Sequence, residues 1–228
     1  MPQRDKDIYA SAPLRHLLAE EAAALLPDLQ RCAGTHALLI SALSHDRPPI
    51  LPLLGNWVRL RLVGHRFHGD ARACADEALP FIDDAFGLVL LRHAVEVAPA
   101  PQELLQEACR VLAPGGVLVL TGLHPWSGWL PWLYWQGRDG VMPALKSPLT
   151  LERWVRAGEL DVERMQRVGH VWPHSGTDAR GVHAFGGGYV LIARKRRRAV
   201  TPTRLKPKLV SATVNVNLAP GARRSASS

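Results

Sequence analysis

The sequence predicts a globular α/β protein built on a largely parallel sheet. Residues 88–91 and 117–123 are nearly continuous apolar runs, which is typical of strands covered on both faces by helices. Between them, residues 101–112 place apolar side chains at helical spacing, and residues 113–116 read as a tight turn. Strand, helix and strand in this order form one βαβ unit with a right-handed crossover. The 228 residues suit one such domain with appendages.

The elements before this unit follow from the same patterns. Residues 14–26 carry leucines at helical spacing, and Pro27 is expected to disturb or end that helix. Residues 36–43 predict a short buried strand. Residues 57–63 alternate apolar side chains with Arg59 and Arg61, so they predict a half-exposed strand. Residues 64–78 are polar and predict an irregular segment.

The C-terminal half opens on a tryptophan-rich segment. Trp126, Trp129, Trp132 and Trp135 recur every three residues. This segment is either a lid or membrane-interface element that grips a lipid-like or aromatic acceptor, or a loop packed over the sheet with partial exposure. Residues 149–157 then predict a helix capped by Thr150, residues 160–168 a strand, and residues 189–193 the last strand.

The charge is unevenly distributed along the chain. Residues 1–194 hold 19 basic and 20 acidic side chains, whereas residues 195–228 hold nine basic ones and no acid. We therefore expect a domain at 1–194 and a basic, flexible and mostly disordered tail at 195–228. The tail either binds an anionic polymer or membrane surface, or simply keeps the protein in solution.

Several classes of protein are disfavoured by composition. No apolar run approaches the roughly 18 residues of a membrane helix, and no export signal is evident, so a cytoplasmic location is expected. The three cysteines are far apart, and the ten histidines form no cluster with metal-ligand spacing. We expect neither a disulfide framework nor a metal.

Residues 78–122 contain three motifs in order: Leu79-Pro80-Phe81, Phe86 with Leu88-Val89, and Arg110-Val111-Leu112 with Pro114-Gly115-Gly116. With these motifs the segment resembles the central half of class I S-adenosylmethionine-dependent methyltransferases of the type-11, ubiquinone/menaquinone-biosynthesis-like group, in a bacterial branch with a degenerate glycine loop. The resemblance implies a Rossmann-like sandwich with a mostly parallel seven-stranded sheet whose last strand is antiparallel. It also implies S-adenosylmethionine as the cofactor, bound at the carboxyl ends of the strands.

The chain departs from the family where that cofactor should bind. The glycine loop expected at residues 40–46 contains no glycine, and the acid expected after the second strand falls at Gly64-His65. The residues at the corresponding places are candidate cofactor contacts. They are Ser41, Ser44, His65, Asp76, Glu77, Arg92 and His93.

Each candidate has an alternative role. The two serines can cap a turn, and the two acids can form a solvated pair in a loop. Arg92 can bind the cofactor carboxylate or lie at the surface, and His93 can contact a ligand or pack in the core.

His124 follows the fifth strand of the family pattern and is the candidate general base, because imidazole exchanges protons near neutral pH. Trp126 and Trp129 are the candidate contacts to an unknown acceptor substrate. The leading hypothesis is therefore methyl transfer to that acceptor. The alternative is a catalytically inactive methyltransferase-like domain that serves as a binding or regulatory module.

Overall fold

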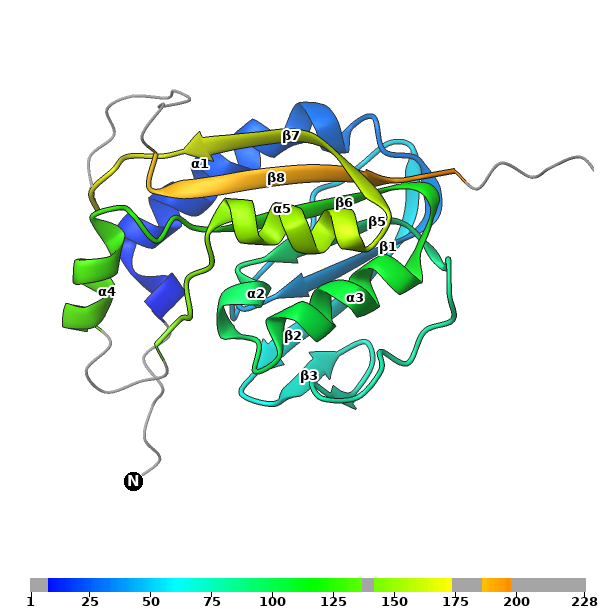
Figure 1. The fold of residues 1–228 in the computed structure, drawn as a ribbon, viewed down its shortest axis with the longest axis horizontal. Coiled ribbons are helices and arrows are strands. Elements are labelled where there is room, and N and C mark those ends of the chain that lie inside the picture. Colours follow the sequence, from blue (N-terminus) through cyan, green and yellow to red (C-terminus); the bar gives the residue numbers. More distant parts are fainter. Residues whose placement is uncertain (1–7, 137–141, 174–185, 198–228) are drawn as a thin grey trace, which may run out of the picture. The chain divides into compact units, whose positions relative to one another are not determined.

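A computed structural model describes residues 8–136, 142–173 and 186–197 of the chain. These residues form an eight-stranded sheet in the order β4-β3-β2-β1-β5-β6-β8-β7 (Figure 1). The strands are β1 (Gly34–Ser41), β2 (Leu54–Val63), β3 (Arg66–Gly69), β4 (Ala73–Cys74), β5 (Phe86–Arg92), β6 (Leu112–Leu123), β7 (Leu160–Val168) and β8 (Gly188–Lys195). The helices are η1 (Ile8–Ala10), α1 (Ala12–Leu29), α2 (Ala94–Val97), α3 (Pro101–Val111), α4 (Trp129–Gln136) and α5 (Pro148–Ala157).

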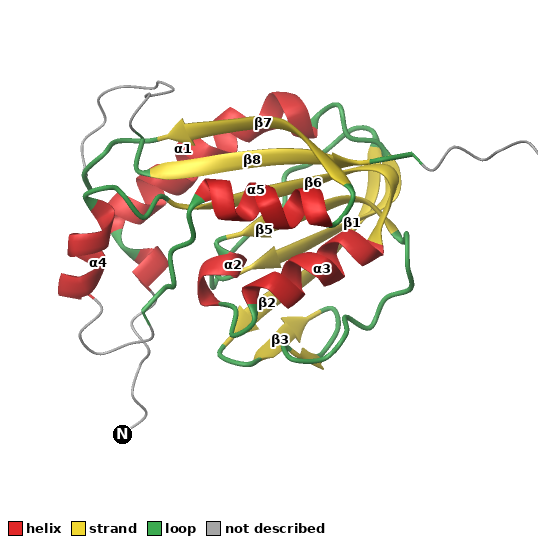
Figure 2. Cartoon of the chain, in the orientation of Figure 1, coloured by secondary structure: helices red, strands yellow, loops and turns green. Residues whose placement is uncertain are grey.

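Helices cover the sheet on both faces, as its apolar strands predict (Figure 2). In β1, Leu38 and Ile40 pack on the face covered by α3 and α5, whereas Ala37 and Leu39 pack on the face covered by α1. Successive side chains of the strand thus enter the two cores alternately, and both cores are apolar.

The predicted Rossmann-like α/β sandwich is confirmed. β1 pairs in parallel with β2 and β5, and β5 pairs in parallel with β6. The last strand, β8, runs antiparallel between β6 and β7, as expected.

The expected number of seven strands was wrong, because residues 64–78 are not irregular. They form β3 and the two-residue β4, which extend β2 as an antiparallel meander. Gly64 adopts a left-handed φ of 58° in the hairpin turn, a conformation that favours glycine. Two neighbouring parallel strands are usually connected through a helix, but the connection from β1 to β2 differs. Residues 42–53, all of them described, contain no helix.

Of the two expectations for Pro27, the structure excludes the ending of the helix: α1 continues to Leu29, since a proline in the last turn removes only one helical hydrogen bond. The expected cap at Thr150 was wrong. Thr150 lies inside α5, and Ser147 occupies the N-cap position with Pro148 following it.

Candidate functional site

A cavity of about 490 Å³ opens at the carboxyl ends of β1 and β5. One wall is the face of α1 that carries Arg15, Leu18 and Ala22, and the other is the loop 43–47. Tyr9 closes one side, and Arg92 at the end of β5 contributes the strand-end part of the lining. The position of the cavity agrees with the rule that open α/β sheets bind ligands beyond the carboxyl ends of their strands. The volume lies within the range of small-molecule sites.

Three polar side chains close the turn that follows β1. The Ser41 hydroxyl donates to Asp46 Oδ2 at 2.7 Å and accepts the backbone N–H of Leu43 at 3.1 Å. Arg92 Nη1 donates to Asp46 Oδ1 at 2.5 Å. The side chains of Arg92 and Asp46 are only 12% and 6% exposed, so this is a largely buried ion pair. We call Ser41, Asp46 and Arg92 the clasp.

A buried charged cluster lies next to the clasp in sequence and in space. His93 Nε2 lies 3.2 Å from Glu21 Oε2, and its Nδ1 lies 3.1 Å from Glu96 Oε2. Burial disfavours the charged imidazole, but the carboxylates of Glu21 and Glu96 outweigh it and raise the pKa of His93 to about 10. Tyr9 also donates to Glu96, at 3.1 Å. His93 is therefore an imidazolium held between two carboxylates and is fully buried.

The remaining candidate cofactor contacts are not brought to this cavity. His65 lies exposed in the β2–β3 turn. Asp76 and Glu77 are exposed and line a second cavity of about 220 Å³, between the segment 75–79 and helix α3. Of the predicted contacts, only Ser44 and Arg92 line the cavity at the end of β1, and Ser41 lies directly behind it.

His124 and Trp126 form a separate pair at the end of β6. His124 Nδ1 accepts the backbone N–H of Trp126 at 3.2 Å, and the two rings lie edge to face at 6.2 Å. Partial burial, with a smaller contribution from the charge of Arg167, lowers the pKa of His124. The imidazole is therefore neutral at pH 7, and its unprotonated nitrogen is Nδ1, which accepts the Trp126 N–H. It does not line the cavity at the end of β1.

The tryptophans of this segment behave differently from one another. Trp126 is 81% exposed, whereas Trp129 is buried and donates its indole N–H to the carbonyl of His170 at 2.9 Å. Trp132 packs against Trp129 with the ring centroids 5.6 Å apart. Trp129 thus packs into the core, while Trp126 remains free to contact a ligand.

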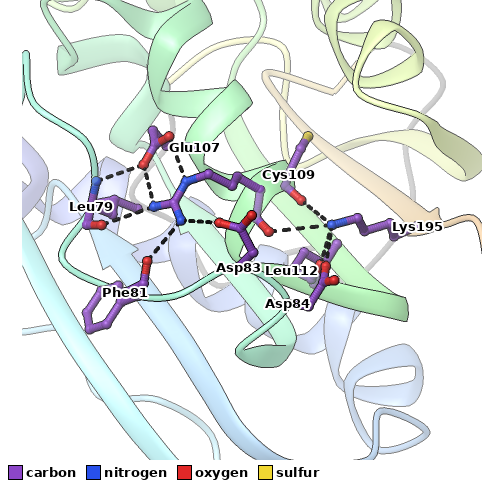
Figure 3. Close-up of polar contacts among 9 residues, drawn as sticks. Leu79, Phe81, Asp83, Asp84, Glu107, Cys109, Leu112 and Lys195 are labelled. Carbon is purple, nitrogen blue, oxygen red and sulfur yellow. Dashed lines mark hydrogen bonds and ion pairs between the residues drawn. The ribbon is translucent and has the colours of Figure 1, made fainter.

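The motifs that carry the family resemblance meet at a different place, shown in Figure 3. Arg110 donates to both carboxylate oxygens of Glu107 and to the carbonyls of Leu79 and Phe81. Glu107 also accepts the backbone N–H of Leu79 at 2.7 Å. Arg110 thereby holds the Leu-Pro-Phe segment against α3, so these motifs build the scaffold rather than the cavity.

Lys195 ties the end of β8 to the end of α3. Its Nζ donates to the carbonyls of Cys109 and Leu112 and to Asp84 Oδ1, as Figure 3 shows. A lysine in this position satisfies carbonyls that the helix end leaves unpaired. The predicted tail boundary at 195 therefore falls on a residue that belongs to the folded domain.

The sequence reading missed Asp46, Glu21 and Glu96. Asp46 lies 46 residues from Arg92, and Glu21 lies 72 residues from His93, so no local spacing links these partners. Glu96 lies three residues after His93, so its spacing was a local signal that could have been found. Within the described ranges, no group of histidine, cysteine or acidic side chains is arranged to hold a metal. No helix of those ranges is long and apolar enough to cross a membrane.

Residues 58–120 match the family described as a methyltransferase domain. The fold also matches a chain from the complex of a Haloferax volcanii methyltransferase with its activator, at 14% identity and a TM-score of 0.55. That match covers 81% of this chain and 92% of the other. The domain has the class I methyltransferase fold. A SAM-dependent methyltransferase from Thermotoga maritima matches this methyltransferase fold at 14% identity and a TM-score of 0.50, covering 81% of this chain and 99% of that one.

Curated relatives match part of this methyltransferase-like chain. A 2-methyl-6-phytyl-1,4-hydroquinone methyltransferase of Oryza sativa subsp. japonica is 33% identical over 147 residues, covering 62% of this chain and 38% of the relative. The uncharacterized protein YafS of Escherichia coli is 32% identical over 142 residues, covering 56% of each. The chain thus spans less than two thirds of the length of either relative.

The cofactor implied by the methyltransferase family is S-adenosylmethionine, and the site fits one end of it. Its amino-acid end carries a carboxylate, and the cavity offers the guanidinium of Arg92, which is paired with Asp46 in this structure. The ribose end fits less well. The segment after β2 supplies His65 where the family places an acid, and Asp46 is the one acid among the cavity's described lining residues.

Proposed function

We propose that the protein is an S-adenosylmethionine-dependent methyltransferase that binds the carboxylate of the cofactor at Arg92. The carrying observation is the cavity at the carboxyl ends of β1 and β5, where the largely buried guanidinium of Arg92 can bind a carboxylate. The class I methyltransferase fold and the matched family support the same conclusion.

The side chains of the cavity would bind and orient the cofactor. Arg92 would bind the carboxylate of the cofactor, and Ser44 would supply a further hydrogen bond. The apolar face of α1, with Leu18 and Ala22, would cover part of the adenosine. The bound cofactor supplies an electrophilic methyl group, and methyl transfer then depends mainly on alignment of the acceptor.

The acceptor of the rice relatives, by their names, is a hydroquinone with a phytyl chain. A phenolic acceptor suits the pair at the end of β6. His124 can take the proton of a hydroxyl once Nδ1 releases the backbone N–H of Trp126, and exposed Trp126 can cover an apolar ring. We propose a cytoplasmic location, supported by the three free cysteines, Cys32, Cys74 and Cys109.

A second candidate function is a binding module without methyl transfer. It is favoured by the clasp, in which the polar groups after β1 are already bonded to one another. The scaffold motifs do not discriminate between the two functions, since they lie at α3.

Titration calorimetry with S-adenosylmethionine and S-adenosylhomocysteine tests the proposal. We expect dissociation constants in the range of about 1–100 µM, and a loss of about tenfold or more in the Arg92→Met variant. The matched control is Arg59→Met, because Arg59 forms an exposed ion pair with Asp70 away from the cavity. No heat and no thermal shift at millimolar ligand would favour the binding module.

A further inference from the structure

The contact between Asp46 and Arg92 uses only part of what the arginine offers. Arg92 Nη1 donates to one oxygen of Asp46, and Nη2 makes a long 3.4 Å contact with the carbonyl of Leu18. Nε is buried and has no hydrogen-bond partner among the described residues. A guanidinium binds a carboxylate best through two parallel N–H···O bonds, and Asp46 provides one.

We propose that Arg92 is a carboxylate-binding residue whose site Asp46 fills until the carboxylate of an amino-acid ligand replaces it. The source of that ligand, the zwitterionic end of S-adenosylmethionine, rests on the proposed function. The carboxylate of Asp46 is thus an internal substitute for the carboxylate of the ligand. Binding exchanges one carboxylate for another, so the buried charge of Arg92 is compensated in both states.

The position of Asp46 makes this exchange feasible. It lies in the segment 42–53, which has no helix to hold it, and its second anchor is the Ser41 hydroxyl at 2.7 Å. Release of Asp46 therefore requires the loss of one ion pair and one hydrogen bond, and no helical turn has to unfold.

The other charges around the cavity favour an anionic group. Arg15 and Arg47 line it, are exposed, and form no ion pair with any described residue. With Asp46 paired to Arg92, the remaining charge at the cavity is positive and attracts an incoming carboxylate.

The first experiment measures the release of Arg92 without any ligand. Phenylglyoxal modifies accessible arginines, and mass spectrometry reports the extent at Arg92 in the wild type, in Asp46→Asn and in the control Asp70→Asn. Asp70 is matched because it also pairs with an arginine, Arg59, but at the surface. We expect modification of Arg92 to rise severalfold in Asp46→Asn alone. Equal protection of Arg92 from phenylglyoxal in all three proteins would overturn the proposal that Asp46 occupies its site.

The second experiment measures binding of S-adenosylhomocysteine and of 5′-methylthioadenosine, which lacks the amino-acid end. We expect Asp46→Asn to bind S-adenosylhomocysteine at least about fivefold more tightly than the wild type, with no gain for 5′-methylthioadenosine. A weaker affinity for the first ligand, or an equal gain for both, would overturn the proposal. If Asp46→Asn does not fold, Ser41→Ala loosens Asp46 without removing a charge, and a smaller gain in the same direction is expected.

The two proposals fail in different ways. Arg92 could become reactive in Asp46→Asn while neither the wild type nor the variant binds S-adenosylmethionine or S-adenosylhomocysteine. Asp46 would then still be shown to shield Arg92, and the proposed function would be wrong. L-methionine then serves as the carboxylate probe, and the absence of any binding to Asp46→Asn would overturn Arg92 as a carboxylate site too.

Discussion

His93 carries a positive charge although its side chain is fully buried. Its ring lies between Glu21 of α1 and Glu96 of α2, and all three side chains are almost completely buried. The backbone of His93 adopts a left-handed φ of 53°. Its ring lies between the two carboxylates and does not line the cavity. The residue that sequence reasoning offered as a ligand contact is thus a link between α1 and the end of β5.

Removal of one member of this cluster should be costly. We expect Glu21→Gln to lower the free energy of unfolding by about 3–5 kcal/mol, because it leaves buried charge without its partner. Urea denaturation measures the change. Glu152→Gln is the control, since Glu152 pairs with the exposed Arg156 on the surface of α5, and a change below about 1 kcal/mol is expected there. Equal effects in both variants would contradict this role.

The same cluster predicts how stability depends on pH. The pKa of His93 is raised from 6.5 to about 10 in the folded protein. Its stabilising contribution is therefore fully present below pH 6.5 and is lost as the pH rises through about 10. The free energy of unfolding of the wild type should fall between pH 7 and pH 10 more steeply than that of His93→Gln. Parallel pH profiles for the two proteins would show that His93 is not charged in the folded state.

At the scale of elements, Arg110 joins α3 to the segment that precedes β5. Its guanidinium reaches the carbonyls of Leu79 and Phe81, the carboxylate of Glu107 and that of Asp83. This geometry needs a planar fork of donors, which lysine does not possess.

We therefore expect Arg110→Lys to lower the free energy of unfolding by about 2 kcal/mol, through the loss of several hydrogen bonds to the Leu-Pro-Phe segment. The same variant should be cut faster by protease between residues 75 and 85. Arg156→Lys provides the control, because the guanidinium of Arg156 is exposed and donates to Glu152 on its own helix. Unchanged stability and cleavage in Arg110→Lys would show that the fork is dispensable.

For the whole molecule, the boundary between domain and tail decides what a truncation removes. Lys195 caps α3, and Arg196 pairs with Asp161 of β7 at 2.8 Å. Residues 199–228 lie outside the described part of the chain, and they contain five of the nine basic residues first assigned to the tail.

Two truncations separate these contributions. Deletion of residues 199–228 should leave the melting temperature unchanged but lower the salt concentration that elutes the protein from heparin, because fewer cations contact the polymer. Deletion of residues 195–228 should also lower the melting temperature by several degrees, since α3 loses the lysine at its end. Identical melting temperatures for the two truncations would contradict the role of Lys195.

The sequence allowed the middle of the sheet to be predicted because β5, α3 and β6 are contiguous and strongly patterned. It did not reveal β3 and β4, because short polar strands lack a clear alternation and gain their order from pairing with β2. Arg92 was identified from its place after a strand. Asp46 and Glu21 were not, because contacts over 46 and 72 residues leave no local pattern.

The missing helix between β1 and β2 has a kinetic consequence. The few backbone hydrogen bonds of residues 42–53 go to neighbouring segments, such as that from Ala42 to the carbonyl of Arg92. The amide hydrogens of residues 43–47 should therefore exchange with deuterated water far sooner than those of β1, even though both border the same cavity. This wall of the cavity would then rearrange many times while the sheet itself stays intact.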